Sequence, residues 1–401
     1  MSGLQVESVR GLSAFRDLET DWRRLQGDTA SSSACPPFLS FEWAESWHRH
    51  LGTGRLPRMV CVRDGRELVA LLPLCEETAR LPGLGRPITR LSFAGERQGG
   101  ADYLDVLARG PRRAQATALI FEHLAQARDF DLLELDGMDE GSPSHPSILT
   151  SFGDRARFKQ RVLPRYVCPQ IELDGGFAKV LARSSRADNY KRRLRQLRAM
   201  EGFEHRMVRA PEEAAAAFER FLHLHDLRWK EQGGSDGLGR PSTRAFHREM
   251  VLRLAEAGRL HFDELWVGGD CVASIYGIDE ARRGDTFYFF QSGYDPAWAR
   301  RSVGLVLLGL SIEAAIGRGA RVYDFLHGME PYKLEWAGGR RRTVAVRVVS
   351  LGFGSSLMLL REAGEAIARR GAHALLPEGW VERLRRMRRA RESREGGPSF
   401  G

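Results

Sequence analysis

The chain has 401 residues, of which 42% are apolar, and a formal net charge of +9. This apolar content fills two domains of ordinary size and argues against a disordered or fibrous protein. Only 5 of the 61 basic residues are Lys. An Arg-rich surface of this charge attracts polyanions such as phosphate-bearing cofactors, tRNA, anionic lipid or acidic polysaccharide, so charge alone does not single out nucleic acid.

The cysteines and the apolar segments bear on the cellular compartment. The five cysteines are scattered and odd in number, without a CxxC pair, which favours a reducing compartment. The first residues show no basic region followed by an apolar one, as a signal peptide would. The longest apolar stretch, 302–317, contains Ser311 and Glu313 and is shorter than the roughly 20 residues of a membrane span. We therefore expect a cytoplasmic protein without a transmembrane segment.

The first half of the chain alternates expected helices and strands. Apolar residues at spacings of three and four indicate the helices, and alternating or continuous apolar runs between turn residues indicate the strands. In chain order, the expected elements are an amphipathic helix over 12–25, a Trp-bearing helix over 40–51, a β-hairpin over 58–77 with its turn at Asp64-Gly65, a strand over 102–108, a helix over about 112–128 and a strand over 130–138. This alternation predicts an α/β or α+β layered architecture.

The second half repeats this order. The expected elements are a basic amphipathic helix over 179–202, helices over 212–234 and about 243–257, two strands over 259–280 joined by a Gly-Gly-Asp turn, a strand over 283–295, a buried helix over 300–319 and a strand over 320–326. We therefore expect two tandem domains, 1–166 and 167–352, followed by a basic tail over 353–401. The tail is Arg-rich and poor in large apolar residues, which is typical of a solvated terminal helix or of an appendage that touches phosphate, lipid or RNA.

The segment YFFQSGYDPAWARRSVGLVLL joins a strand to a helix that begins near Ser302. Two arginines precede the helix, whose unpaired N–H groups and dipole suit a pyrophosphate. The fragment from Arg301 to Gly304 resembles the phosphate-binding turn of GNAT acyltransferases, Gln/Arg-x-x-Gly-x-Gly/Ala, although Val306 stands at its last position.

A wider resemblance comes from four stretches in order: HDLRWKEQGG, YFFQSGYD, the RRSVG turn with its apolar helix, and DFLHGMEPYKLEW. Over about residues 180–340 the chain resembles the bacterial CelD-like acetyltransferase family, a GNAT branch related to the FemABX peptidyltransferases and built from two GNAT-like halves. The resemblance implies two tandem GNAT-like domains, the first degenerate. His327 and Met329 stand where many relatives have an Arg and an acidic residue.

Acyl transfer from a thioester needs a deprotonated nucleophile, stabilisation of an oxyanion and a proton for the leaving thiolate. Within the resemblance, Asp324, Glu330 and Tyr332 are the candidates for the proton roles, with Tyr332 as the acid. Asp324 ends an expected strand, where α/β sites gather. A structural alternative is that Asp324 and Lys333 form an ion pair that fixes the loop, while Tyr332 and Trp336 pack as a lid.

The remaining candidates bind ligands. The backbone N–H groups around Ser292 and Gly293 would face the oxyanion, and Arg301, Ser302 and Gly304 would bind the cofactor phosphates. Lys333 is a candidate anion contact, and Trp229 either lines the acceptor pocket or faces the core. His223, His225 and His327 have no metal-ligand spacing, and we expect them to be ordinary surface or core residues.

Three functions fit the sequence. The first is acyl-CoA-dependent, metal-free transfer of an acetyl or other acyl group to an amine or hydroxyl of a sugar or amino-acid derivative, for example a glycan precursor in cell-surface polysaccharide synthesis. The second takes its donor from aminoacyl-tRNA, as the FemABX resemblance permits, with the basic helix around Lys191 to Arg193 as a contact surface. The third is a non-catalytic partner in a biosynthetic complex. The sequence names neither the acyl group, the acceptor nor the oligomeric state.

Overall fold

The computed structural model describes residues 3–29, 35–80, 87–153, 155–230, 237–280 and 285–351. Residues 1–78 and 89–350 form one compact unit, and residues 79–88 and 351–401 are grouped apart from it. The expected basic tail, 353–401, lies outside the described residues. The first unit carries the described sheet and helices, apart from the strand ends at Ala79 and Ile88.

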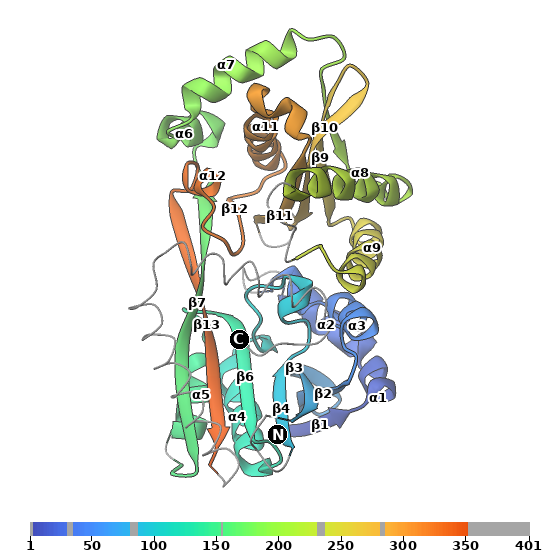
Figure 1. The fold of residues 1–401 in the computed structure, drawn as a ribbon. Helices are drawn as coiled ribbons and strands as arrows, with labels where there is room; N and C mark the ends of the chain where they lie inside the picture. The colour runs from blue at the N-terminus through green and yellow to red at the C-terminus, as the bar shows by residue number, and fades with distance from the viewer. Residues whose placement is uncertain are drawn as a thin grey trace, which may run out of the picture. The chain divides into compact units, whose positions relative to one another are not determined.

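The strands of this unit form one mixed sheet in the order β1-β2-β3-β4-β6-β13-β7-β12-β11-β10-β9-β8, with β5 paired to β3 (Figure 1). The strands are β1 (Leu4–Arg10), β2 (Arg55–Asp64), β3 (Glu67–Ala79), β4 (Ile88–Phe93), β5 (Leu107–Ala108), β6 (Leu132–Asp139), β7 (Phe158–Glu172), β8 (Glu204–Val208), β9 (Leu260–Val267), β10 (Asp270–Asp279), β11 (Thr286–Tyr294), β12 (Val322–Asp324) and β13 (Gly339–Ser350). We call β1–β6 the N-terminal half of the sheet and β8–β12 its C-terminal half.

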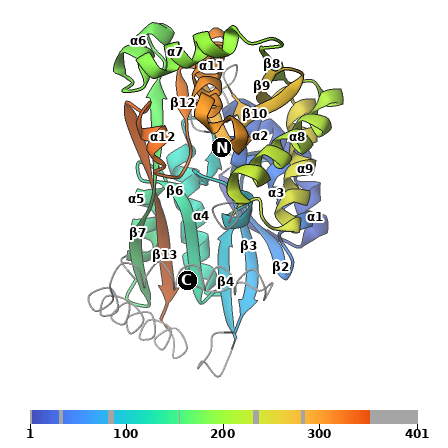
Figure 2. The same ribbon diagram turned by 45° about the horizontal axis from the view of Figure 1, so that its top comes forward.

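The helices cover both faces of the sheet. They are α1 (Leu12–Asp17), α2 (Glu19–Thr29), α3 (Phe41–His50), α4 (Arg113–Ala127), α5 (His145–Gly153), α6 (Gly176–Arg183), α7 (Ala187–Arg198), α8 (Pro211–Lys230), α9 (Pro241–Glu256), α11 (Val303–Gly317) and α12 (Pro331–Leu334), with short 3-10 turns η1 (Pro37–Leu39), η2 (Arg97–Gly99) and η3 (Pro296–Arg301). In the C-terminal half, α8 and α9 pack together on one face (Figure 2), and α11 packs on the other beneath α6 and α7.

Two long strands connect the halves. β7 and β13 pair with each other over most of their lengths (Figures 1 and 2). The far end of β7 also pairs with β12 of the C-terminal half, at Gln170 and Asp324. The far end of β13 returns to pair with β6 of the N-terminal half, from Thr343 to Val349. Each half is therefore completed by a strand that also belongs to the other, and the expected domain boundary at 166/167 falls inside β7.

Local sequence explains the C-terminal half. Gly268 and Gly269 both have positive φ, +62° and +89°, as the two-residue turn between β9 and β10 requires. α11 is apolar on almost every side because the sheet buries one face and α6 and α7 cover another. The long basic helix expected over 179–202 is two helices, because the chain bends at Ser184, whose hydroxyl accepts from the N–H of Arg186.

Most expected elements are confirmed, with two corrections in the first half. The single helix expected over 12–25 is α1 and α2. The strand expected over 102–108 is wrong except for β5. Tyr103 has a φ of +62° and the N–H of Val106 is bonded to the carboxylate of Asp105, so this segment is a loop whose apolar side chains are nevertheless buried. No helix within the described residues has the length and hydrophobicity to cross a bilayer.

Candidate active site

A gap opens in the C-terminal half where β11 and β12 separate. Their parallel pairing ends at Tyr288 and Asp324, yet β11 continues to Tyr294. Just beyond this point β11 has a bulge, because Gly277 and Tyr276 of β10 pair with Phe289 and Gln291 and leave Phe290 as an extra residue. Such bulges are frequent beside active sites, where they redirect side chains. The gap leaves one side of the β11 backbone without a strand partner from β12.

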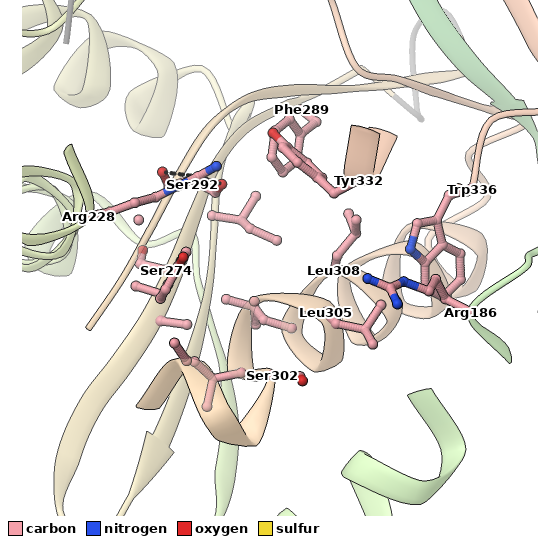
Figure 3. Close-up of a pocket in the computed structure, with 18 of the residues that line it drawn as sticks. Arg186, Arg228, Ser274, Phe289, Ser292, Ser302, Leu305, Leu308, Tyr332 and Trp336 are labelled. Atoms are coloured by element: carbon pink, nitrogen blue, oxygen red, sulfur yellow. Dashed lines mark hydrogen bonds between the residues drawn. The ribbon is translucent and has the colours of Figure 1, made fainter. Parts of the chain in front are cut away.

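A cavity of about 240 Å³ lies in this gap (Figure 3). Its walls are β10 and β11, the first turns of α11, and the segment that leaves β12 and carries α12. The lining is mostly apolar and comprises Arg186, Arg228, Ala273, Ser274, Ile275, Phe289, Ser292, Gly293, Tyr294, Ala299, Ser302, Val303, Gly304, Leu305, Leu307, Leu308, Tyr332, Glu335 and Trp336. An apolar cavity with a few polar groups at its ends suits an elongated organic ligand.

The N-terminus of α11 forms one end of the cavity. Ser302, which precedes the helix, has a φ of +56°, a conformation that is costly for a residue with a side chain, and its hydroxyl does not cap the helix. The N–H groups of Val303, Gly304 and Leu305 thus have no acceptor from within the helix. Together with the helix dipole they favour an anionic group at this end of the cavity.

Besides Arg186, which is ion-paired with Glu335 at 2.9 Å, the cavity lining contains a second cation, Arg228. It comes from α8 and donates to the hydroxyl and carbonyl oxygens of Ser292, at 2.9 and 3.3 Å. Its guanidinium also lies 5.4 Å from the ring centroid of Tyr294 and 5.6 Å from that of Tyr332. Among the described residues no carboxylate lies within ion-pair distance of Arg228. The sequence alone assigned Arg228 no role.

Five of the residues expected in the site come together at the cavity: Ser292, Gly293, Ser302, Gly304 and Tyr332. Burial raises the pKa of Tyr332 above its ordinary value, although Arg228 and Ser292 oppose the shift. Gly293 has a packing role as well, because a Cβ there would lie 2.4 Å from the backbone nitrogen of His225 in α8. A Cβ on Gly304 would meet only Tyr294, at 3.7 Å.

Asp324 does not line the cavity. It is completely buried and accepts hydrogen bonds from the Tyr103 hydroxyl at 3.0 Å, from Gln170 Nε2 at 2.6 Å and from the Leu326 N–H at 2.8 Å. Burial raises its pKa to about 6, although Gln170, Arg341, Leu326 and Tyr103 each favour the charged form. Asp324 thus joins a loop of the N-terminal half to the strand end of the C-terminal half.

Glu330 and Lys333 also lie outside the cavity lining. The ammonium group of Lys333 contacts Glu330 Oε2 at 3.0 Å and donates to the backbone carbonyl of His327 at 3.0 Å. The ion partner of Lys333 is therefore Glu330. The alternative prediction of an ion pair between Asp324 and Lys333 is wrong. The buried Lys333 fixes the turn between β12 and α12.

Arg301 and Trp229 lie away from the cavity lining too. Arg301 is exposed beside the start of α11, where its guanidinium is 5.3 Å from the Trp298 ring and contacts the Met200 sulfur. Trp229 lines a second, more open cavity of about 410 Å³ on the outer side of α8, with His223, Asp226, Leu227, Lys230, Gly239 and Arg244. Within the described residues, no three His, Cys, Asp or Glu side chains cluster as a metal site would require.

Part of the chain matches a known protein family. Residues 184–334 match the family model described as an acetyltransferase (GNAT) domain. That range contains α7, α8, α9, α11, α12, β8–β12 and all of the cavity lining except Glu335 and Trp336. A search of curated protein sequences found no match.

Solved structures with a similar fold cover both halves of the chain. The crystal structure of FemX is 11% identical, with a TM-score of 0.56, and the match covers 84% of this chain and 97% of that one. A protein of unknown function from Bacteroides thetaiotaomicron is 12% identical, with a TM-score of 0.51, over 83% and 97% of the two chains. The C-terminal domain of a putative lysylphosphatidylglycerol synthetase from Agrobacterium fabrum is 9% identical, with a TM-score of 0.51, over 86% and 95%. The chain therefore has a GNAT-like α/β fold.

Proposed function

We propose that the protein is an acyl-CoA-dependent acyltransferase that transfers its acyl group directly to an amine or hydroxyl of a sugar or amino-acid derivative. The observation that carries this proposal is the cavity in the β11–β12 gap, which ends at the N-terminus of α11. In this assignment, the apolar walls hold the pantetheine arm and the first N–H groups of α11 hold the pyrophosphate. Arg301, exposed beside that terminus, adds a phosphate contact.

The cavity residues suggest how the transfer is assisted. Tyr332 is the proposed proton donor for the leaving thiolate, since a phenol with a raised pKa is fully protonated at neutral pH. Arg228 is proposed to stabilise the oxyanion, because its guanidinium lies in the cavity lining without a carboxylate partner among the described residues. The Ser292 N–H, also proposed as an oxyanion donor with Gly293, donates to Gln291 Oε1 at 3.1 Å and would have to exchange that bond. Asp324 and Glu330 lie outside the cavity lining. If either carboxylate transfers a proton in the reaction, it does so from outside the cavity.

Calorimetric titration with acetyl-CoA and with longer acyl-CoAs tests the proposal. Gly304→Glu would place a carboxylate beside the proposed pyrophosphate position, and we expect it to weaken binding at least tenfold. Arg301→Ala should weaken it less, because Arg301 is exposed. Gly317→Glu is the matched control, since it adds the same charge at the far end of α11, where a side chain meets open space. Failure of the native protein to bind any CoA species would overturn the proposal and favour transfer from aminoacyl-tRNA or, failing that, a non-catalytic partner role.

A second candidate, transfer from aminoacyl-tRNA, is favoured by one observation. Lys191, Arg192, Arg195 and Arg198 are exposed on α7, and the described side-chain partner of Arg192 is the neutral Asn189. If this face binds tRNA, affinity should fall steeply between about 50 and about 200 mM salt, and reversal of two of these charges should reduce the slope by about two counterions. The assignments to the cytoplasm and to cell-surface polysaccharide synthesis stay predictions from the sequence.

A further inference from the structure

A histidine–carboxylate pair lies where the two halves of the sheet meet. His327 follows β12 by three residues, and its Nδ1 lies 2.7 Å from Asp102 Oδ2. The backbone N–H of His327 donates to the same oxygen, at 3.0 Å. Asp102 comes from the N-terminal half, in the loop before β5. A carboxylate that accepts both bonds fixes the position of the imidazole and places its proton on Nδ1, so that Nε2 carries the free lone pair.

The two partners differ sharply in exposure. The side chain of Asp102 is 1% exposed, whereas that of His327 is 43% exposed. The imidazole packs against the ring of Tyr166 in a tilted arrangement, with 5.0 Å between centroids and 33° between planes. A buried carboxylate that orients an accessible imidazole is the arrangement of a general base and its positioning residue.

Backbone strain marks both loops of this pair. Tyr103, next to Asp102, has a φ of +62°, and Leu326, next to His327, has a φ of +54°. Side chains disfavour this conformation, and it persists where surrounding contacts enforce it, often at functional sites. Here the enforcing contacts include Asp324, which accepts from both the Tyr103 hydroxyl and the Leu326 N–H. The strain thus coincides with the residues that bring His327 and Asp102 together.

The segment that leaves β12 carries both the pair and a wall of the cavity. Tyr332 and Trp336, on this segment, line the cavity. Lys333, between them, holds the carbonyl of His327. Phe325 packs into the core beneath α11, whereas Leu326 packs into the larger core that contains α8, α9 and much of the N-terminal half. The segment thus passes from the core beside the proposed donor to the core shared with the N-terminal half just before His327.

We propose that His327, positioned by Asp102, is the general base that deprotonates the acceptor amine or hydroxyl, and that the acceptor enters between the Asp102 loop and the β12 exit. This inference rests on the function proposed above. As Nε2 takes the proton, the acceptor nitrogen or oxygen bonds to the thioester carbonyl carbon. The carbon–sulfur bond then breaks, and the thiolate leaves with the electron pair and takes a proton from Tyr332 or from the imidazolium. Acyl thioester and acceptor become acylated acceptor and free thiol.

The charges around the imidazole agree with this role. Partial desolvation by its neighbours lowers the pKa of His327, but the charge and hydrogen bond of Asp102 outweigh this effect and raise the pKa above its ordinary value. Lys333 lowers the pKa and Glu330 raises it, while Tyr166 is an aromatic neighbour. Without Asp102 the pKa should fall and the proton should no longer be confined to Nδ1.

The test measures thiol release from acetyl-CoA with amino sugars, amino acids and water as acceptors, across the pH range. His327→Gln should lower kcat at least a hundredfold and remove the acidic limb of the pH profile, and added imidazole should restore part of the rate in His327→Ala. Asp102→Asn should shift that limb to lower pH, and Asp102→Glu should partly restore it. His223→Gln, at an exposed histidine outside the proposed site, is the matched control.

A second measurement does not depend on having chosen the correct acceptor. p-Nitrophenyl acetate needs no CoA, and an accessible oriented imidazole should accelerate its hydrolysis, with loss in His327→Gln and not in His223→Gln. Equal rates for the native protein and His327→Gln with both donors would overturn this inference. Because the variants should bind acetyl-CoA normally by calorimetry, a failed base assignment is distinguishable from a failed acyl-CoA proposal.

Discussion

Gly309 of α11 lies directly against the ring of Tyr190 of α7. A Cβ on Gly309 would be 2.1 Å from Tyr190 Cε2 and 2.7 Å from Cδ2. Tyr190 is itself buried between Phe177 and Trp336, with ring centroids 5.7 and 5.8 Å away. It therefore has little room to move, and the absence of a side chain at Gly309 sets how closely α7 approaches α11.

Gly309→Ala should destabilise the protein by about 1–3 kcal/mol, because the added methyl group overlaps a ring that is already packed. The measurement is urea unfolding followed by circular dichroism. Gly317→Ala in the same helix is the control, since open space surrounds that position, and it should be neutral or slightly stabilising. An unchanged free energy of unfolding in Gly309→Ala would mean that the Tyr190 ring can move aside without loss of stability.

Asp324 should make stability fall as the pH rises from about 4 to about 6. Burial raises its folded pKa to about 6, from an ordinary value of 3.8. The folded state therefore holds the proton more tightly than the unfolded state, and ionisation above this window costs up to about 3 kcal/mol. Asp324→Asn removes the ionisation, so its stability relative to the native protein should be higher at pH 7 than at pH 4. A constant difference across that window would contradict the assignment.

Arg228→Lys should lower acyl-transfer turnover at least tenfold, which is about 1.4 kcal/mol. Both bonds to Ser292 come from Nη1, and a Lys ammonium could reproduce them. Lysine loses the planar guanidinium that lies beside the rings of Tyr294 and Tyr332, together with its remaining donors for an oxyanion. Acyl-CoA binding measured by calorimetry should change less than turnover. Arg248→Lys, in an exposed ion pair with Glu219, is the control. Unchanged turnover in Arg228→Lys would remove Arg228 from the proposed machinery.

Arg90 should be essential to the stability of the N-terminal half. It is buried and contacts Glu96 at 2.9 Å, Glu134 at 2.6 Å and also Glu77. Arg90→Met removes the cation and leaves buried carboxylates without its compensation, at a cost of about 3–5 kcal/mol. Arg24→Met, at an exposed pair with Asp21, should cost less than about 1 kcal/mol. Thermal unfolding of both variants checks the difference, and equal melting temperatures would contradict it.

Sequence patterns predicted much of the C-terminal half because its signals are local. The apolar stripe of α8, the continuous apolar run of α11 and the Gly268-Gly269 turn each depend on residues within one element. The same reasoning failed at 102–108, where buried apolar side chains belong to a loop. Burial and alternation look alike in a strand and in a loop whose backbone bonds are made by side chains such as Asp105.

Contacts between distant parts of the chain had no local signal. His327 and Asp102 are 225 positions apart in the sequence. Neither residue belongs to a motif of fixed spacing that would identify the pair. Arg228 is one of 61 basic residues, and only its reach to Ser292 distinguishes it. The loop motif from Asp324 to Trp336 did mark a segment that lines the cavity, through Tyr332, Glu335 and Trp336. Which of its residues line the cavity depended on packing that one sequence does not reveal.

The shared strands β7 and β13 have a consequence for synthesis on the ribosome. The N-terminal half needs Val344–Val349 of β13 beside β6, and these residues are made after the whole C-terminal half. During translation, β6 therefore exposes an unpaired edge for the time needed to add some 200 residues, roughly ten to forty seconds at ordinary elongation rates. A fragment that ends at residue 166 would keep that edge permanently and should self-associate. The two halves should therefore complete their folding together and not as independent domains.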